Sequence, residues 1–375
     1  MKIIIDNKIP FIKGVFEPYA EVVYMPGSAT TSDVVRDADA LITRTRTACT
    51  KELLEGSSVK AIATATIGFD HIDTIWCENN GIAWSNAPGC NSWSVKQYIS
   101  AALVTLARKH SLNLENMTLG VVGVGNVGSK VAQVGRALGM KVLLNDPPRE
   151  RISNEGFVSL DTIIDESDII TVHVPLVKDG PDKTYHLFDE SLIGRLTPHQ
   201  ILINSSRGQV VDNKALKKAL QEKRLKGAVL DVWEGEPAID LELLDLLDIS
   251  TPHIAGYSAD GKANGTAMSV RYIARQLGIE PLLNWSPEDI PSPSQSLSFS
   301  IDAREKTALQ VLTEAILYTY DIEADSLKLK SSPADFERLR GDYIIRREPS
   351  AFSLELIGAD SEIKSKLIET GYEKI

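Results

Sequence analysis

Residues 118–128 read Thr-Leu-Gly-Val-Val-Gly-Val-Gly-Asn-Val-Gly. Three glycines in this stretch have the spacing G-x-G-x-x-G: Gly123, Gly125 and Gly128. An apolar run at 119–122 precedes them, and a helical pattern at 127–138 follows. This order of strand, turn and helix is what a dinucleotide-binding loop requires. The stretch therefore predicts a βαβ unit that binds a dinucleotide, and more than a hundred residues before it leave room for a second domain.

The three glycines have different physical roles in such a loop. The first permits a tight turn, the second lets a pyrophosphate approach the backbone, and the third lets the helix pack closely on the strand. Amide groups at the positive end of the helix then bind the phosphates. The expected cofactor contacts in the loop are Gly123, Gly125, Asn126, Val127 and Gly128.

An acidic residue follows at the spacing that this motif needs. A second strand is predicted at 141–145, and Asp146 follows it, 18 residues after Gly128. The expected spacing is about 20 residues, and a carboxylate there accepts hydrogen bonds from the ribose hydroxyls. Because it would repel a 2′-phosphate, the sequence favours NAD over NADP.

Composition places the chain among globular proteins with more than one domain. It has 375 residues, of which 43% are hydrophobic, and a formal net charge of −11. That charge argues against nonspecific binding to nucleic acid or to an anionic membrane. The three cysteines lack metal-ligand spacing, so we expect no metal site and a reducing cytoplasm. We find neither a signal peptide nor a run of the roughly 18 apolar residues that span a membrane.

Short apolar runs alternate with helical stretches through the first 280 residues, and this alternation predicts parallel α/β sheets. Helices are expected at 92–110 and 261–277. Besides the two strands already described, strands are expected at 2–5, 21–24, 40–43, 60–64, 82–85, 169–174, 201–204 and 228–232.

The composition changes at Pro281. Residues 284–296 contain three prolines and four serines, which is typical of a linker or an extended segment. Beyond it we expect a helix at 303–319, a strand at 343–347 and an alternating strand at 351–356. This C-terminal region carries no recognisable chemical motif. An apolar-patterned segment after a linker is most simply an interface, so a two-fold homodimer is expected.

Three further segments place polar residues after predicted strands, where an open α/β sheet binds its ligands. Arg207 follows the strand at 201–204, Glu236 lies in the loop after 228–232, and His253 lies in the segment Thr-Pro-His-Ile-Ala-Gly-Tyr. Together they suit oxidation of an alcohol beside NAD. His253 can take the hydroxyl proton, Glu236 can orient the imidazole and favour its charged form, and Arg207 can hold a substrate carboxylate in two parallel bonds.

At these motifs the chain resembles the D-isomer-specific 2-hydroxyacid dehydrogenases. The resemblance covers roughly residues 1–280 and rests on GVVGVGNVG, HVPL, INSSRGQVVD, LDVWEGEP and TPHIAGYS. It implies two doubly wound parallel-sheet domains: a split, flavodoxin-like substrate domain at 1–95 and 256–280, and a Rossmann NAD domain at 96–255. A small α+β dimerisation domain would occupy 281–375.

The resemblance also implies particular contacts. Cofactor contacts would come from Asp146, Ser205, Ser206, Arg207, Asp231 and Gly256. Substrate contacts would come from Thr45, Thr66 and Tyr257.

Further details favour one branch of the family, in which a phosphorylated 2-hydroxy acid is oxidised for vitamin B6 synthesis. They are ATATIGFDHID, APGCN, NDPPRE, KDGPDKTYHL and the C-terminal region itself. A phosphorylated substrate needs a cationic pocket. Arg44 and Arg46 flank Thr45 and would share one face of an extended segment, so one of them is expected to bind the phosphate. Arg346 and Arg347 are alternatives that would reach a partner subunit's site.

Other functions remain open at this point. A 3-phosphoglycerate dehydrogenase shares the same core and an anionic substrate, and other D-2-hydroxyacid dehydrogenases share the chemistry. A binding protein that uses the dehydrogenase fold as an NAD-sensing scaffold is the alternative outside enzymes, because a fold alone does not imply a function.

Overall fold

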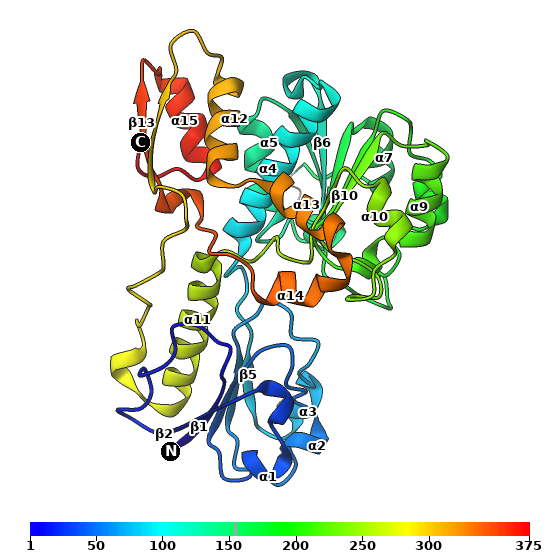
Figure 1. Cartoon of the computed structure of the whole chain (residues 1–375). Helices are drawn as coiled ribbons and strands as arrows, with labels where there is room; N and C mark the ends of the chain where they lie inside the picture. Colours follow the sequence, from blue (N-terminus) through cyan, green and yellow to red (C-terminus); the bar gives the residue numbers. More distant parts are fainter. Residues whose placement is uncertain (154–155) are drawn as a thin grey trace. The chain divides into compact units, whose positions relative to one another are not determined.

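The computed structural model describes residues 1–153 and 156–375. The chain forms two compact units (Figure 1). Unit 1 comprises Met1–Asn91 and Ser258–Pro291, and unit 2 comprises Ser92–Tyr257 and Ser292–Ile375. The C-terminal region, residues 292–375, thus belongs to the same unit as the glycine-rich loop. The division into three domains stays a prediction.

Unit 1 contains a five-stranded parallel sheet with the order β2-β1-β3-β4-β5. This is the flavodoxin-like order that the resemblance implies. The strands are β1 (Lys2–Asp6), β2 (Glu21–Met25), β3 (Ala40–Thr43), β4 (Ala61–Thr64) and β5 (Ala83–Ser85).

Alternation along the strands gives this sheet two covered faces, because successive side chains of a strand point to opposite sides. Ile3 and Ile5 pack with Val270 and Ile273 of α11 (Ala259–Leu277), whereas Ile4 packs on the opposite side. Three short helices contribute to that opposite side, namely α1 (Ser32–Val35), α2 (Lys51–Leu54) and α3 (Thr74–Asn79).

Unit 2 contains a six-stranded parallel sheet with the order β11-β10-β9-β8-β6-β7. The chain passes from β6 to β7 on one face and returns to β8 across the other, so the strand order reverses at β6. The glycine-rich loop therefore leaves the sheet at its switch point, where α/β proteins bind their ligands. The strands are β6 (Thr118–Val122), β7 (Lys141–Asn145), β8 (Ile169–Val172), β9 (Ile201–Asn204), β10 (Gly227–Leu230) and β11 (Ile249–Ser250).

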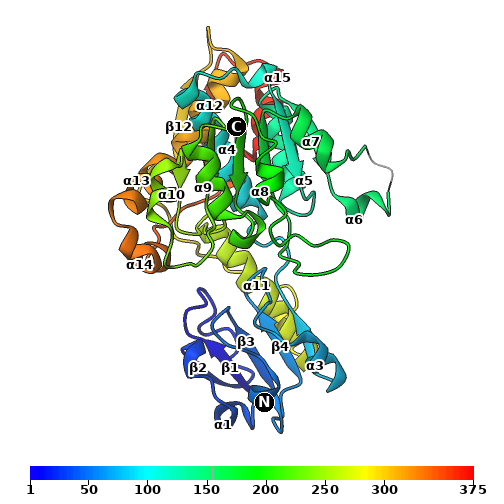
Figure 2. The ribbon, with the colours of Figure 1, turned by 90° about the vertical axis from the view of Figure 1, so that its right-hand side faces the viewer.

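Helices cover both faces of this second sheet (Figure 2). One face, with Leu119 and Val121, packs on α4 (Ser92–His110) and α5 (Gly128–Ala137). The other face, with Ile170 and Leu202, packs on a second set of helices. These are α7 (Leu160–Glu166), α8 (Glu190–Ile193), α9 (Asn213–Gln221) and α10 (Leu241–Leu246). The short α6 (Pro147–Glu150) follows β7.

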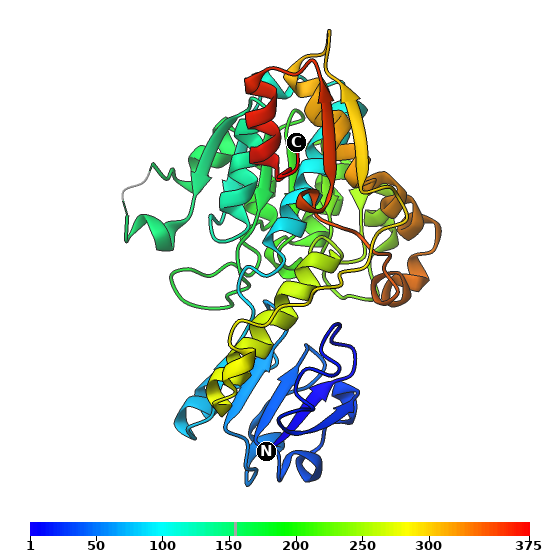
Figure 3. The same ribbon diagram turned by 90° about the vertical axis from the view of Figure 1, so that its left-hand side faces the viewer.

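The C-terminal region contains a parallel pair of strands, β12 (Ser298–Asp302) and β13 (Ser353–Ile357), drawn in orange and red in Figure 3. Most buried apolar side chains of this region share one hydrophobic core with α4 and α5, whereas Leu329 and Phe336 belong to the core on the other face of the sheet. The helices are α12 (Ala308–Thr319), α13 (Ile322–Ser331), α14 (Phe336–Gly341) and α15 (Ser361–Thr370).

The predicted α/β class and its parallel sheets are confirmed, and every predicted strand before residue 280 exists within two residues of its expected ends. In the C-terminal region the prediction of a strand at 343–347 is wrong, because these residues have no regular structure. The helix expected from 303 begins at Ala308, and β12, α13, α14 and α15 were not predicted.

Within residues 1–153 and 156–375, no helix is both long and apolar enough to cross a membrane. The same residues contain no group of three or more histidine, cysteine or acidic side chains that is suited to a metal ion.

Candidate active site

The glycine-rich loop has the shape that a pyrophosphate needs. Gly123 has a φ of +85°, and a Cβ there would lie 2.7 Å from the carbonyl carbon of His173. A Cβ at Gly128 would lie 1.9 Å from the Gly123 carbonyl oxygen, so only glycine fits this approach of helix to strand. Beside Gly125, by contrast, the space within 4 Å of such a Cβ is open. The loop thus leaves room at the one glycine where a phosphate must come close.

Asp146 links the end of β7 to the glycine-rich loop that follows β6. Its carboxylate accepts hydrogen bonds from the Val124 amide, at 2.8 Å, and from the Arg149 amide, at 3.1 Å. An ionised carboxylate has about four acceptor sites, so capacity for ribose hydroxyls remains. This geometry allows Asp146 to bind the ribose hydroxyls, and that contact stays a prediction.

The turn after β9 is held by a residue that sequence reasoning missed. Asn204 is fully buried, and its side chain donates to the Arg207 carbonyl while accepting from the Ser206 amide and hydroxyl. Ser205 Oγ, in the same turn, is buried with no hydrogen-bond partner among the described residues. A buried hydroxyl without a partner suits a bound group such as the predicted cofactor. Arg207 is half-buried, and its guanidinium donates to the Ser206 carbonyl.

The loops after β9 and β10 touch through their backbones. A Cβ at Gly208 would lie 2.0 Å from the Trp233 carbonyl oxygen. Asn213 and Glu234 exchange two hydrogen bonds between their side chains and backbone amides, at 3.0 and 3.1 Å. The loop that carries Arg207 is therefore fixed against the loop that carries Glu236.

Glu236 and His253 form the pair that the sequence predicts. Glu236 Oε2 lies 2.8 Å from His253 Nδ1, and its other oxygen accepts from the Trp233 amide at 2.9 Å. Burial raises the pKa of Glu236, but the bond to His253, the imidazole charge and the Trp233 amide outweigh it, so the net pKa lies below its ordinary value. An ionised Glu236 accepts the proton of Nδ1, which leaves Nε2 of a neutral imidazole as the base.

A buried carboxylate shapes the loop that carries His253. Asp231 accepts from the amides of Ile254 and Ala255, at 2.7 and 2.9 Å, and from the Thr251 hydroxyl at 2.7 Å. His253 has a φ of +57°, an uncommon conformation that these bonds support. Burial raises the pKa of Asp231 despite these donors. Asp231 was predicted to contact the cofactor. Here its oxygens serve the loop, and the cofactor contact stays a prediction.

The C-terminal region also holds the loop that carries His253, through hydrogen bonds to its backbone carbonyls. The Arg346 side chain is 3% exposed, and its Nη2 donates to the carbonyls of Ala255 and Ile254, at 2.6 and 3.2 Å. Its guanidinium lies 4.4 Å from the centre of the Tyr320 ring. The hypothesis that Arg346 reaches a partner's site is wrong, because this side chain is buried against its own chain.

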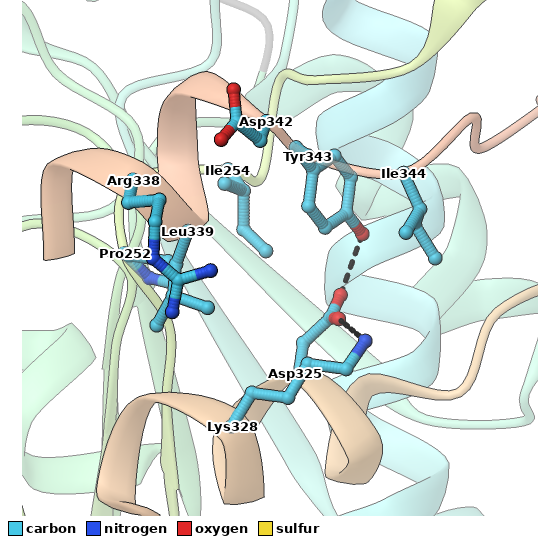
Figure 4. Close-up of a pocket in the computed structure, with 9 residues that line it drawn as sticks. All are labelled: Pro252, Ile254, Asp325, Lys328, Arg338, Leu339, Asp342, Tyr343 and Ile344. Carbon is cyan, nitrogen blue, oxygen red and sulfur yellow. Dashed lines mark hydrogen bonds and ion pairs between the residues drawn. The ribbon is translucent and has the colours of Figure 1, made fainter. Parts of the chain in front are cut away.

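A small cavity of about 160 Å³ lies where this region meets the loop. Pro252 and Ile254 line it together with residues of α13 and α14 (Figure 4). Tyr343 and Lys328 both donate to the Asp325 carboxylate there, at 2.5 and 3.3 Å. The C-terminal region thus contacts the residues next to His253 directly.

Four of the predicted substrate contacts lie in unit 1. Arg44 is half-buried after β3, whereas Thr45 and Arg46 are exposed in a turn. The expectation that the two arginines share a face of an extended segment is therefore wrong. The Thr66 hydroxyl contacts Thr64 Oγ1 and the Gly68 carbonyl, at 2.8 and 2.9 Å. Tyr257, the remaining predicted substrate contact, and Gly256, a predicted cofactor contact, follow His253 in unit 2.

Comparison with known proteins agrees with this geometry. Residues 93–255 match the family described as "D-isomer specific 2-hydroxyacid dehydrogenase, NAD binding domain". This range contains the glycine-rich loop, Asp146 and the catalytic candidates.

Curated relatives extend the match to nearly the full chain. A protein of Bacteroides fragilis named erythronate-4-phosphate dehydrogenase is 52% identical over 356 residues, which cover 94% of this chain and 99% of the relative. A protein of the same name from Escherichia coli O157:H7 is 41% identical over 379 residues, covering 100% of this chain and 99% of the relative.

Solved structures share the fold. A D-lactate dehydrogenase from Aquifex aeolicus, complexed with NAD and lactic acid, has a TM-score of 0.64 and 29% identity, and covers 78% of this chain and 100% of its own. An NAD-dependent formate dehydrogenase from Staphylococcus aureus has a TM-score of 0.61 at 24% identity over 75% of this chain and 96% of its own, which shows the fold alone. The chain belongs to the D-isomer-specific 2-hydroxyacid dehydrogenase family, and within it to the group of the erythronate-4-phosphate dehydrogenases.

Proposed function

We propose that this chain oxidises 4-phospho-D-erythronate to 2-oxo-3-hydroxy-4-phosphobutanoate with NAD, in the biosynthesis of pyridoxal 5′-phosphate. The observation that carries the proposal is the identity of 41–52% with relatives named erythronate-4-phosphate dehydrogenase, over almost the whole chain. The Glu236–His253 pair at 2.8 Å supplies the acid–base chemistry that this oxidation needs.

NAD is the cofactor, and the residues around the glycine-rich loop fit it. The open space beside Gly125, the unpartnered Ser205 hydroxyl and the Asp146 carboxylate suit pyrophosphate, a polar cofactor group and ribose, respectively. When bound, NAD accepts the hydride that leaves C2 of the substrate. The individual cofactor contacts belong to the proposal.

The protein's own residues handle the proton and the carboxylate. His253 Nε2 takes the proton of the C2 hydroxyl, and Glu236 stabilises the positive charge that the imidazole gains. Arg207 binds the substrate carboxylate through two parallel N–H bonds and polarises the neighbouring carbon–oxygen bond. As the C–H bond breaks, the new carbonyl forms and His253 holds the released proton.

Turnover of three acids decides between the substrate candidates. NADH appearance should be fastest with 4-phospho-D-erythronate, compared with 3-phosphoglycerate and D-lactate. A preference for 3-phosphoglycerate would contradict the proposal and move the chain to serine synthesis. If all three acids were inactive in both directions although NAD binds, an NAD-sensing scaffold would be favoured.

Arg44 and Arg46 remain candidates for binding the phosphate. Arg44→Ala should raise the KM for 4-phospho-D-erythronate about tenfold or more, while D-erythronate is much less affected, because an arginine–phosphate bond is charge-assisted. Steady-state kinetics with both acids measures this. Equal effects on the two acids would contradict the role of Arg44.

We also propose a homodimer formed through residues 281–375, in the cytoplasm. In support of the dimer, this region exposes large apolar side chains, among them Ile357, Ile368 and Ile375. In support of the compartment, the three cysteines are free thiols. Sedimentation of the full chain should give a dimer, and a monomer at micromolar concentration would contradict the assembly.

A further inference from the structure

Arg340, a residue of α14 in the C-terminal region, lies against a predicted substrate contact. Its Nε donates to the Tyr257 hydroxyl at 3.0 Å, and its guanidinium carbon lies 5.6 Å from the centre of that ring. Tyr257 also packs edge-on against Tyr343, with ring centres 6.4 Å apart. The tyrosine thus fixes one edge of the guanidinium in a defined orientation.

The rest of this guanidinium is available for a ligand. Arginine has five N–H donors, and the bond to Tyr257 uses only the one on Nε. Within the described residues, no carboxylate lies within 4.0 Å of Arg340 and its terminal amino groups make no hydrogen bond. Arg338, on the same helix, is different because it pairs with Asp335. Arg340 is thus a half-buried cation that bonds to a neutral hydroxyl among the described residues, and such a cation suits an anionic ligand.

Arg340 is also within electrostatic reach of the catalytic pair. Its positive charge is among the influences that lower the pKa of Glu236. Glu236 in turn bonds to His253. The guanidinium therefore lies near the place where substrate must meet the base, without being bonded to either member of the pair.

We propose that Arg340 binds the phosphate group of the substrate and so determines the preference for a phosphorylated acid. This inference rests on the proposed function. The planar guanidinium presents two parallel donors that match phosphate oxygens. Arg207 is already assigned to the substrate carboxylate. The phosphate is the second anionic group of the substrate, and it needs a second guanidinium.

The comparison with solved structures points the same way. The D-lactate dehydrogenase complexed with lactic acid is matched over 100% of its length by only 78% of this chain. Part of this chain therefore has no counterpart in an enzyme whose bound acid carries no phosphate. The relatives named for a phosphorylated acid cover 94–100% of this chain.

The test compares Arg340→Met with Arg338→Met, a matched control on the same helix. Arg340→Met should raise the KM for 4-phospho-D-erythronate about 10- to 100-fold and change kcat little, as expected for an interaction made equally in ground and transition states. Kinetic constants for D-erythronate should stay within about twofold. Arg338→Met should behave as wild type with both acids, since its guanidinium pairs with exposed Asp335.

Inhibition by inorganic phosphate gives an independent readout. Phosphate should compete with the substrate in the wild type, and Arg340→Met should weaken that inhibition by a factor similar to the rise in KM. Tyr257→Phe should give a smaller effect in the same direction, because the Tyr257 hydroxyl orients the guanidinium of Arg340.

Two outcomes would overturn the proposal. One is an unchanged KM in folded Arg340→Met. The other is an equal fall of kcat with both acids, which would mean that Arg340 acts through Glu236 and not on the phosphate. If Arg340→Met does not fold, Arg340→Lys tests the same claim, since lysine keeps the charge without the fork. A wild type that does not oxidise 4-phospho-D-erythronate would instead refute the proposed function.

Discussion

Residues 92–257 and 292–375 lie in one compact unit, but they contribute to the candidate active site in different ways. The first segment carries the glycine-rich loop, Arg207 and the Glu236–His253 pair, each placed by a strand of the same sheet. The second carries no residue of that chemistry. It supplies Arg346 behind the His253 loop and Arg340 beside Tyr257. The first segment thus carries the residues proposed for the reaction, and the second supports the His253 loop and supplies the proposed phosphate contact.

The two segments are joined by polar contacts as well as by a shared core. Helix α4 is nearly covered, and its Lys96 and Gln97 donate to the carbonyls of Glu369 and Arg347, at 2.5 and 3.0 Å. The Ser250 amide donates to the Ser326 hydroxyl at 3.0 Å. Because buried polar groups need such partners, removing the C-terminal region would leave several of them unpaired. The structure thus favours a C-terminal region that is integral to this unit.

The largest expected effect concerns the chemistry of the first segment. His253→Asn should lower turnover roughly 10²- to 10⁴-fold, the usual range for the loss of an acid–base group. NAD binding, followed by fluorescence of the reduced cofactor, should be retained, because the proposed role of His253 is toward the substrate hydroxyl. Unchanged turnover in this variant would remove the basis for assigning the chemistry to residues 92–257.

A smaller effect tests the support from the second segment. Arg346→Met should lower the free energy of unfolding by about 2–3 kcal/mol, because two buried carbonyls lose a charged donor. Urea denaturation followed by circular dichroism measures this difference. Arg304→Met is the control, since Arg304 forms a solvent-exposed pair with Asp302, and exposed pairs contribute little to stability. An equal loss of unfolding free energy in the two variants would mean that the buried bonds of Arg346 stabilise the fold no more than an exposed ion pair does.

The smallest effect concerns the junction at α4. Burial, together with the charge of Lys130, lowers the pKa of Lys96 to about 8, although Glu369 opposes this. The unfolded chain, with a pKa of 10.5, binds more protons between those two values, so stability should rise with pH across that window. Below about pH 8 the full cost of the buried charge is present. Lys96→Met should remove this pH-dependent part of the stability.

Denaturation of wild type and Lys96→Met at pH 7 and pH 10 gives the difference, in which other titrating groups largely cancel. The wild type should gain stability relative to the variant as the pH rises. A constant difference would contradict a charged, buried Lys96 at this junction.

The same contrast explains what could be predicted from the sequence. Arg207, Glu236 and His253 were predictable because each follows a strand of a periodic α/β pattern, and parallel strand ends meet at one edge of a sheet. The Glu236–His253 bond confirms that two of them meet. Three glycines and Asp146 were predictable because their spacing reflects the geometry of one βαβ unit.

Arg340 and Arg346 could not be found in this way. Their partners, Tyr257 and Ala255, lie 83 and 91 residues earlier in the chain, and no local pattern encodes such a contact. The segment at 343–347 was predicted to be a strand from its apolar and β-branched residues. Tertiary packing instead buries Arg346 in an irregular segment. There its guanidinium donates hydrogen bonds to the carbonyls of Ile254 and Ala255, and the segment pairs with no strand among the described residues. Asn204 was predicted only as the last residue of a strand, and Asp231 as a cofactor contact, because burial is not visible in a single sequence.

Amide hydrogen exchange of residues 253–257, compared between wild type and Arg346→Met, tests most directly whether the C-terminal region holds the catalytic loop. The account predicts that the amides of Ile254 and Ala255, bonded to Asp231 in the wild type, exchange at least about tenfold faster in the variant. The amides of the central strand β8 should change no more than the loss of global stability requires. Unchanged exchange at Ile254 and Ala255, in a variant that retains its fold, would contradict the claim that residues 292–375 support the site formed by residues 92–257.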